Sequence, residues 1–152
     1  MTDLKELQRD YVRLLIHEGV NLQPGQRLVI TCPVDEAWFA RLCAEEAYDA
    51  GCREVIMNWC DDALSRMKYL RAEDSVFDEC APWRAEFYNS TAEEGAAWLF
   101  IDSDDPENLK GVDPDRIRRS QIASGKAVKT FRDLETSNGF PWCIGAIPSP
   151  AW

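Results

Sequence analysis

Two aspartates that follow an apolar stretch are the first residues whose types and spacing could do chemistry. Asp102 and Asp104 come directly after Ala97–Ile101, a run with the composition of a strand that is buried on both faces. Parallel sheets bind ligands beyond the carboxyl ends of their strands. Two carboxylates at such a place could bind a metal ion or attack an electrophile.

The Asp-x-Asp spacing superficially resembles the motif of haloacid-dehalogenase-type phosphotransferases. That resemblance implies Asp102 as the nucleophile, Asp104 as the general acid and Mg²⁺ as the cofactor. The small residue that this family has after the motif is replaced here by Asp105-Pro106, and about fifty residues remain for the family's other groups. The simpler interpretation is that Asp105 caps a turn that begins at Pro106, while the other aspartates are solvated.

Histidine and cysteine give little support for a metal or nucleophile site. The chain has one histidine, His17, so two histidines on one helix cannot bind zinc here. Its spacing from Glu6, Asp10 and Arg13 predicts a solvated position on the polar face of a helix. No two cysteines have CxxC spacing, and we expect all of them to pack as small hydrophobic thiols. The six are Cys32, Cys43, Cys52, Cys60, Cys80 and Cys143.

The remaining charged groups favour structural roles. Neither GxGxxG nor a P-loop occurs, so a nucleotide fold of the usual kinds is not indicated. We expect Asp61-Asp62 to be a helix cap and its neighbour. Glu45-Glu46 and Glu93-Glu94 are adjacent pairs, which face different directions on a helix and so form no catalytic dyad. The basic residues of 114–136 are expected to pair with acidic neighbours rather than to bind nucleic acid.

An alternation of strands and helices must position these residues. Short β-branched or apolar runs predict strands at 27–31, 54–59, 97–101 and 142–147. Helical spacing between them predicts helices at 4–19, 35–50, 62–94 (with a break at Ala81-Pro82) and 114–136. The fold class expected is α/β, a three-layer domain with a mainly parallel sheet of about four to five strands.

Several helix ends have recognisable signals. Asp35 is placed to cap the second helix, and Asp113 precedes a proline at the start of the last one. Gly19 and Gly51 are placed to end the first two helices in the usual C′ position.

Length and charge limit the possible partners. A chain of 152 residues is the size of one domain. Its 27 acidic and 17 basic residues give a net charge of −10, which argues against nucleic acid or an anionic membrane as partner. The N-terminus has no pattern of a secretory signal, so we expect a cytoplasmic protein. The apolar ending at Trp152 favours a longer protein that has been cut here.

Six stretches, in this order and spacing, resemble one family over nearly the whole chain. They are Gly19–Gln26 leading into Arg27–Ile30, Glu45–Gly51 before Glu54-Val55, Ala92–Ala96, Asp105-Pro106, Gly111–Ile117 and Ile147–Trp152. Together they are similar to the N-terminal portion of the thermophilic-type metalloaminopeptidases, the group of aminopeptidase T, aminopeptidase S and PepS.

The resemblance implies a two-domain, dimeric enzyme that removes N-terminal amino acids from peptides. Members use two divalent metals, typically zinc or cobalt, held by Glu, His, Tyr and Asp of a C-terminal domain. No catalytic, cofactor-binding or metal-binding residue of the family therefore carries over to this chain. We expect residues 1–152 to be a single N-terminal domain, inactive without its catalytic domain, that shapes the active-site cavity and contributes to subunit contacts. A non-enzymatic regulatory or assembly module is the alternative, and a phosphotransferase using Asp102 is the third hypothesis.

Overall fold

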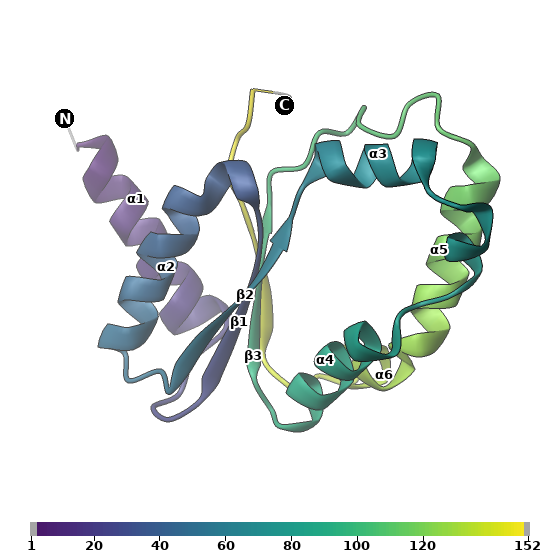
Figure 1. Ribbon diagram of the computed structural model, residues 1–152. Coiled ribbons are helices and arrows are strands. Elements are labelled where there is room, and N and C mark those ends of the chain that lie inside the picture. Colours follow the sequence, from purple (N-terminus) through teal and green to yellow (C-terminus); the bar gives the residue numbers. More distant parts are fainter. Residues whose placement is uncertain (1–2, 151–152) are drawn as a thin grey trace.

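A parallel sheet with helices on both faces forms the protein (Figure 1), as seen in a computed structural model that describes residues 3–150. Within these residues the sheet has four strands in the order β2-β1-β3-β4, and every neighbouring pair is parallel. The strands are β1 (Arg27–Pro33), β2 (Glu54–Cys60), β3 (Ala97–Asp102) and β4 (Trp142–Ala146). The predicted α/β three-layer class and its parallel sheet are confirmed, while the predicted apolar ending at Trp152 lies outside the described residues.

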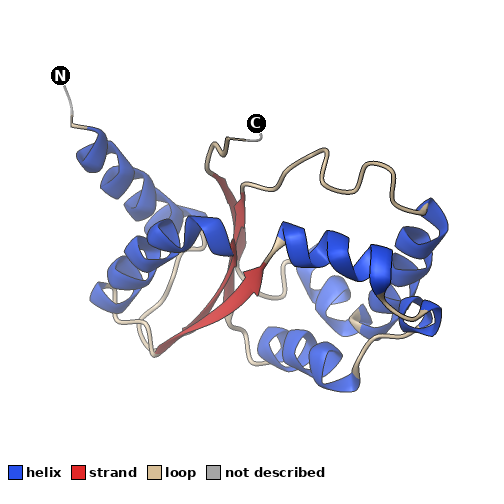
Figure 2. Ribbon diagram, turned by 45° about the horizontal axis from the view of Figure 1, so that its top comes forward, coloured by secondary structure: helices blue, strands red, loops and turns tan. Residues whose placement is uncertain are grey.

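Helices α1 (Leu4–Arg13) and α2 (Ala37–Asp49) cover one face of the sheet. On the other side lie α3 (Asp62–Arg71), α4 (Pro82–Glu93), α5 (Pro114–Ala127) and α6 (Lys129–Thr136). Figure 2 shows these four helices grouped on the side of the sheet opposite to α1 and α2. None of the helices in the described part of the chain has the length and apolar character needed to cross a bilayer.

The face under α1 and α2 is a closely packed apolar layer. Alternate residues of each strand point toward it, as the two-residue period of a strand requires. Leu28 and Ile30 of β1 and Leu99 of β3 have no solvent exposure, and Phe39 of α2 is 1% exposed. They contact α1 and the π-helical turn η1 (Leu14–Gly19) in one cluster.

Tyr11 ties α1 to the last strand. Its hydroxyl donates a hydrogen bond to the carbonyl of Ala146 (3.3 Å) and accepts one from the N–H of the same residue (3.0 Å). At Ala146 the outer edge of β4 is therefore paired with a side chain from the first helix.

Two predicted helix ends are wrong. Gly19 ends η1 without a positive φ; a Cβ there would lie 2.7 Å from the Sγ of Cys143, so close approach to β4 explains the glycine. Asp35 is not a cap, because the chain turns from β1 directly into a 3₁₀ helix (Val34–Glu36) before α2. Gly51, with φ of 89°, does have the left-handed conformation that was predicted.

The predicted long helix 114–136 is broken at Val128, which has φ −97° and ψ 29°. The side chain of Asn89 in α4 forms hydrogen bonds with backbone groups on both sides of this break. Its side-chain amide donates to the carbonyl of Ala127 (3.0 Å) and accepts from the N–H of Phe131 (3.0 Å). The backbone groups exposed by the break therefore have partners, and the chain can bend so that Phe131 enters the core.

The helical region predicted at 62–94 is also divided more than expected. Besides the break before Pro82, α3 ends at Arg71, and a short 3₁₀ helix η3 (Asp74–Asp78) follows. These breaks let α3 lie near the carboxyl ends of the strands while α4 lies against the sheet, and α5 joins the two regions (Figure 1).

Candidate functional site

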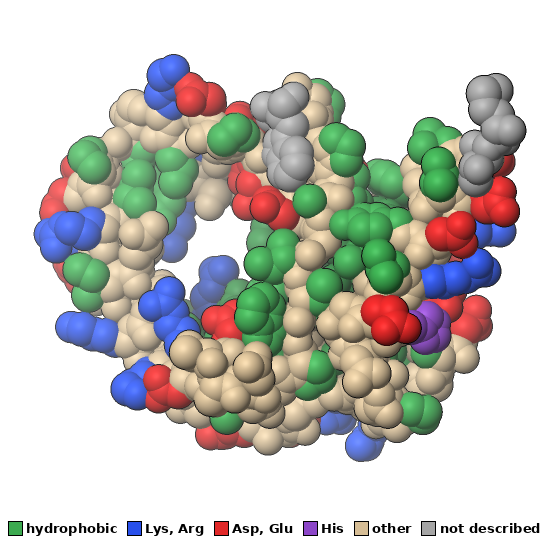
Figure 3. All heavy atoms as spheres, turned by 180° about the vertical axis from the view of Figure 1, so that it is seen from behind, with side chains coloured by type: hydrophobic (Ala, Val, Ile, Leu, Met, Phe, Trp, Pro, Cys, Tyr) green, Lys and Arg blue, Asp and Glu red, His purple; other side chains and the backbone are tan. Residues whose placement is uncertain are grey.

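A hollow lies between the second face of the sheet and the helices α3–α6. Among the described helices, α4 and α6 pack on this face, where Trp98 stacks on Tyr88 (ring centroids 5.2 Å apart) and forms a T-shaped pair with Phe131 (4.8 Å). Helices α3 and α5 stand away from the strands, and Figure 3 shows an opening through this part of the molecule. Two cavities occupy the hollow.

Ion pairs hold the outer wall of the hollow together. Arg119 of α5 donates to Asp78 (2.7 Å) and Asp74 (2.9 Å) of η3, and Arg116 donates to Asp74 (3.2 Å). The Arg116 guanidinium also lies 5.0 Å from the centre of the Phe77 ring. The pKa of Asp78 is lowered by its hydrogen bond with Arg119. The prediction that the basic residues of 114–136 pair with acidic neighbours is confirmed for Arg116, Arg118, Arg119 and Lys129, while Lys126 and Arg132 form no salt bridge within residues 3–150.

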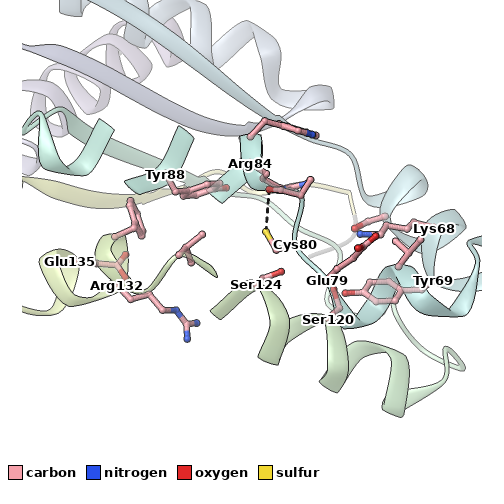
Figure 4. A pocket seen from close by; sticks show the side chains of 16 residues that line it. Lys68, Tyr69, Glu79, Cys80, Arg84, Tyr88, Ser120, Ser124, Arg132 and Glu135 are labelled. Carbon is pink, nitrogen blue, oxygen red and sulfur yellow. Dashed lines mark hydrogen bonds between the residues drawn. The ribbon is translucent and has the colours of Figure 1, made fainter. Parts of the chain in front are cut away.

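The larger cavity, of about 620 Å³, is enclosed by side chains from all four of these helices. Figure 4 shows how they face it, with tyrosines, serines and charged groups of both signs. The labelled residues are Lys68, Tyr69, Glu79, Cys80, Arg84, Tyr88, Ser120, Ser124, Arg132 and Glu135.

Within residues 3–150, the polar side chains of this cavity form no pair of nucleophile and general base. Among the described residues, neither Ser120 nor Ser124 is hydrogen-bonded through its hydroxyl to a general base. Lys68, Arg84 and Arg132 form no salt bridge with any other residue between 3 and 150. The described residues of the cavity therefore include cations, carboxylates and hydroxyls but no activated nucleophile.

The smaller cavity, of about 370 Å³, lies at the carboxyl ends of the strands. A row of side chains crosses the sheet beneath it: Asn58 of β2 is paired with Thr31 of β1, Thr31 with Phe100 of β3, and Phe100 with Ile144 of β4. Three of the four line the cavity directly: Thr31, Phe100 and Ile144. Ile144 is 60% exposed although it lies in the sheet, so this face is left uncovered here.

The two aspartates singled out in the sequence both line this smaller cavity. Asp102 is the last residue of β3, and Asp104 follows in the loop. Burial raises the pKa of Asp104, and the carboxylates of Asp62 and Asp102 raise it further. The structure thus brings several carboxylates into one neighbourhood around Asp104.

Asp105 and Asp61 have the capping roles that were predicted. A carboxylate oxygen of Asp105 accepts from the N–H of Glu107 (2.9 Å), and Asp61 accepts from the N–H of Leu64 (2.9 Å) at the start of α3. Asp62, the neighbour, accepts from the backbone N–H of Asp105 (2.9 Å) and so joins α3 to the loop after β3.

The donor atoms of the described residues do not fit a metal site. Between residues 3 and 150, no three His, Cys, Asp or Glu side chains are grouped so that they could hold an ion. His17 is hydrogen-bonded through its Nε2 to Oε1 of Glu46 (2.7 Å). Both residues lie on the α1–α2 side of the sheet, away from Asp102 and Asp104. Burial raises the pKa of Cys32 and of Cys43 to about 12, so these thiols stay protonated and unreactive.

Sequence reasoning missed the row beneath the smaller cavity. The available signal was Thr31 and Asn58, two polar residues at matching places in otherwise apolar strands. The Asn58 amide donates to the Thr31 hydroxyl (3.1 Å) and to the Tyr88 hydroxyl (2.9 Å). This polar link joins β1 and β2 to Tyr88 of α4 beside the smaller cavity.

Comparisons with known proteins agree on one family. The family model for thermophilic metalloprotease (M29) matches residues 4–152. Aminopeptidase AmpS of Bacillus subtilis (strain 168) is 34% identical over 152 residues, which cover 100% of this chain and 37% of that protein. Aminopeptidase 2 of Geobacillus stearothermophilus is 36% identical over 148 residues, covering 97% of this chain and 36% of the relative.

A solved structure agrees with these sequences. Wild-type AmpT from Thermus thermophilus superposes with a TM-score of 0.92 at 30% identity, over 99% of this chain and 38% of that one. The chain thus spans little more than a third of the length of the proteins it matches.

Proposed function

The chain belongs to the thermophilic metalloprotease family M29, and from that premise we propose that it is the N-terminal α/β domain of an aminopeptidase. The whole enzyme would hydrolyse N-terminal amino acids from peptides. Residues 1–152 would supply a wall of the cavity in which the substrate lies, and a C-terminal domain would supply the catalytic groups.

One observation carries the proposal. All of the chain matches only about a third of each relative, 37% of the Bacillus protein and 38% of the Thermus structure. A unit that has its own core but matches a part of an enzyme fits the role of one domain of that enzyme.

The metal chemistry is assigned to the other domain. The described residues offer no set of three metal ligands, so we derive no catalytic step from this chain. In the whole enzyme we propose two divalent ions, zinc or cobalt, bound beyond residue 152. The role of this domain is then to bind and orient the peptide and to contact the catalytic domain and a second subunit.

The first experiment measures what the chain does alone. The purified 152-residue protein is incubated with leucine p-nitroanilide, with and without added zinc or cobalt, beside full-length aminopeptidase 2 as the positive control. We expect no turnover above the metal-only background. Metal-dependent turnover by the chain alone would contradict the assignment of catalysis to another domain.

The second experiment asks whether the chain can serve as the missing domain. The matched N-terminal third of aminopeptidase 2 is replaced by residues 1–152, and the chimera is compared with the relative from which that third has been deleted. We expect the chimera to hydrolyse leucine p-nitroanilide and the truncated protein to be inactive. A chimera that folds by circular dichroism and binds metal but has no activity would count against the proposal.

The remaining two hypotheses have less support. A regulatory or assembly module would use the same fold, but the matched relatives named above are aminopeptidases. A phosphotransferase would need Mg²⁺ near Asp102, and the carboxylates described around it are not grouped as a metal site.

A further inference from the structure

The larger cavity is lined by cations that have no acidic partner. Lys68 of α3, Arg84 of α4 and Arg132 of α6 line it, and within residues 3–150 none of them forms a salt bridge or a side-chain hydrogen bond. Arg116 and Arg119 of α5 differ, because both are paired with carboxylates of η3. Those two arginines join the helices of the outer wall, whereas the three cations of the cavity have no such structural task.

The guanidinium of Arg132 lies against α5 at a residue without a side chain. Gly125 is part of this helix, and a Cβ at that position would lie 3.0 Å from Nη1 of Arg132. Glycine is less favourable than alanine in a helix, and here its lack of a side chain leaves room for the guanidinium. The preceding residue, Ser124, also lines the cavity (Figure 4), and its hydroxyl forms no hydrogen bond with the described residues. The contact with α5 thus positions Arg132 without using its N–H groups.

The charges of this cavity are not balanced. Glu79 and Glu135 are the carboxylates among the described residues that line it, against three cations. This local excess of positive charge occurs in a chain whose net charge is −10. Charges in a concave site between low-dielectric walls are screened less than charges on an open surface. A single negative charge that enters the cavity would therefore be attracted and would balance the three cations.

The ligand that fits these features is a carboxylate at the end of a small molecule. We infer that the larger cavity binds the C-terminal carboxylate of a short peptide, with Arg84 and Arg132 as its contacts and Lys68 as a further charge. A guanidinium can donate two parallel hydrogen bonds to one carboxylate. The volume of about 620 Å³ is in the range of small-molecule sites, so it can hold the end of a peptide rather than a folded protein.

The inference rests on the proposed function. When the amino end of a peptide lies at catalytic groups in another domain, its opposite end extends toward the wall that this domain supplies. A cation there would favour peptides that are short enough to reach it with a free carboxyl end. The domain would thus select substrates by the length and the charge of the end that is not cleaved.

A titration of the 152-residue chain at low salt, followed by NMR chemical shifts, tests the inference. The probes have an acetylated amino end, so no ammonium contributes to binding. We expect acetyl-glycyl-glycine, which has a free carboxylate, to shift the signals of 80–84 and 124–132. Its C-terminal amide, acetyl-glycyl-glycinamide, should bind at least about tenfold more weakly. Acetyl-aspartyl-amide carries a carboxylate on its side chain, and binding as tight as that of the acid would overturn the assignment to the chain end.

Matched variants separate a site from general attraction between charges. Arg84→Gln/Arg132→Gln should lose about tenfold or more in affinity for acetyl-glycyl-glycine. Arg41→Gln/Lys126→Gln removes the same charge from two exposed cations that do not line the cavity, and it should bind like the unchanged chain.

A third variant changes the position of Arg132 but no charge. Gly125→Leu places a good helix former where the guanidinium lies, so it should weaken binding about as much as Arg132→Gln alone while the helix is retained. Because it keeps every cation, it also tests the site should the double variant fail to fold. Unchanged affinity in Gly125→Leu would contradict the role of a positioned Arg132.

The chimera of aminopeptidase 2 extends the test to catalysis. There Arg84→Gln/Arg132→Gln should reduce kcat/KM for leucyl-glycyl-glycine more than for its C-terminal amide, and Arg41→Gln/Lys126→Gln should reduce neither. Equal reductions for the acid and the amide would contradict recognition of the carboxylate.

Equal affinity of the isolated chain for acetyl-glycyl-glycine and its amide would overturn the inference, and so would equal losses in the two double variants. An active chimera whose N-terminal domain ignores the acid leaves the proposed function standing and removes only this site. An inactive chimera together with intact binding of the acid contradicts the proposed function and leaves the carboxylate site.

Discussion

The two faces of the sheet are covered in different ways. Under α1 and α2 the side chains form one continuous buried cluster, from Val12 to Ile147. On the opposite face the aromatic cluster around Trp98 covers only the amino-terminal half of the strands, and beyond it the helices stand away around two cavities. The same strands thus form a closely packed layer on one face and a partly uncovered layer on the other. The closely packed face stabilises the fold, and the uncovered face is available for binding.

The largest expected effect is on the closed face. Phe39→Ala removes a ring that is 1% exposed and leaves a hole that the surrounding strands cannot fill. We expect a loss of about 3–5 kcal/mol in the free energy of unfolding, measured by urea denaturation. A loss below about 1 kcal/mol would mean that this layer can repack as readily as the open one.

Neighbouring residues of β4 test the comparison within a single strand. A Cβ at Gly145 would lie 2.7 Å from Cδ1 of Leu15, on the closed face. We expect Gly145→Val to cost about 1–3 kcal/mol through overpacking. Ile144 points to the open face, so Ile144→Ser is the matched control and should change stability by no more than about 0.5 kcal/mol. Equal effects at both positions would remove the distinction between the faces.

The outer wall of the open side depends on charge rather than on apolar packing. Arg119→Met removes the hydrogen bonds to Asp74 and Asp78 while keeping most of the aliphatic stem. We expect amide hydrogen exchange in η3 and in the first turns of α5 to become several-fold faster, with the strands unchanged. An increase in exchange spread evenly over the strands would instead show that the two sides unfold as one unit.

The smallest expected effect is an increase in stability rather than a loss. The pKa of Asp104 is raised by burial and by Asp62 and Asp102, so the folded state holds that proton more tightly than the unfolded state does. The stability that Asp104 contributes is therefore fully present below its ordinary pKa near 4 and is lost as the pH rises above it. We expect Asp104→Asn to raise Tm by about 1–3 °C at pH 7, with the difference vanishing near pH 3.

A fall in Tm at pH 7 would show that the Asp104 carboxylate stabilises the fold.

Local signals in the sequence were sufficient for the strands and for several caps. Apolar runs marked all four strands, and Gly51 and Asp61 had the local roles expected of them. The wrong predictions concern positions whose structure depends on residues that are distant in the sequence. The break at Val128 is paired with Asn89, and the glycine at position 19 is explained by the close approach of Cys143.

The candidate site was predictable only in part. Asp102 and Asp104 were found because carboxylates after a buried strand are a local pattern. The cavity beside them depends on α3 and α5 standing away from the sheet, which follows from the ion pairs of Arg116 and Arg119 with η3, more than forty residues earlier in the chain. Neither spacing nor composition encodes that arrangement.

The hydrogen bonds between Tyr11 and Ala146 can form only after nearly the whole domain has been synthesised. Their partners lie 135 residues apart, so the first helix leaves the ribosome long before the strand that it meets. Until β4 emerges, one edge of β3 is unpaired and the side chain of Leu15 lacks part of its cover. The layer that is closed most tightly in the finished protein is therefore the last to be completed, and a nascent chain that stalls before residue 146 exposes both an open strand edge and an apolar surface to its neighbours.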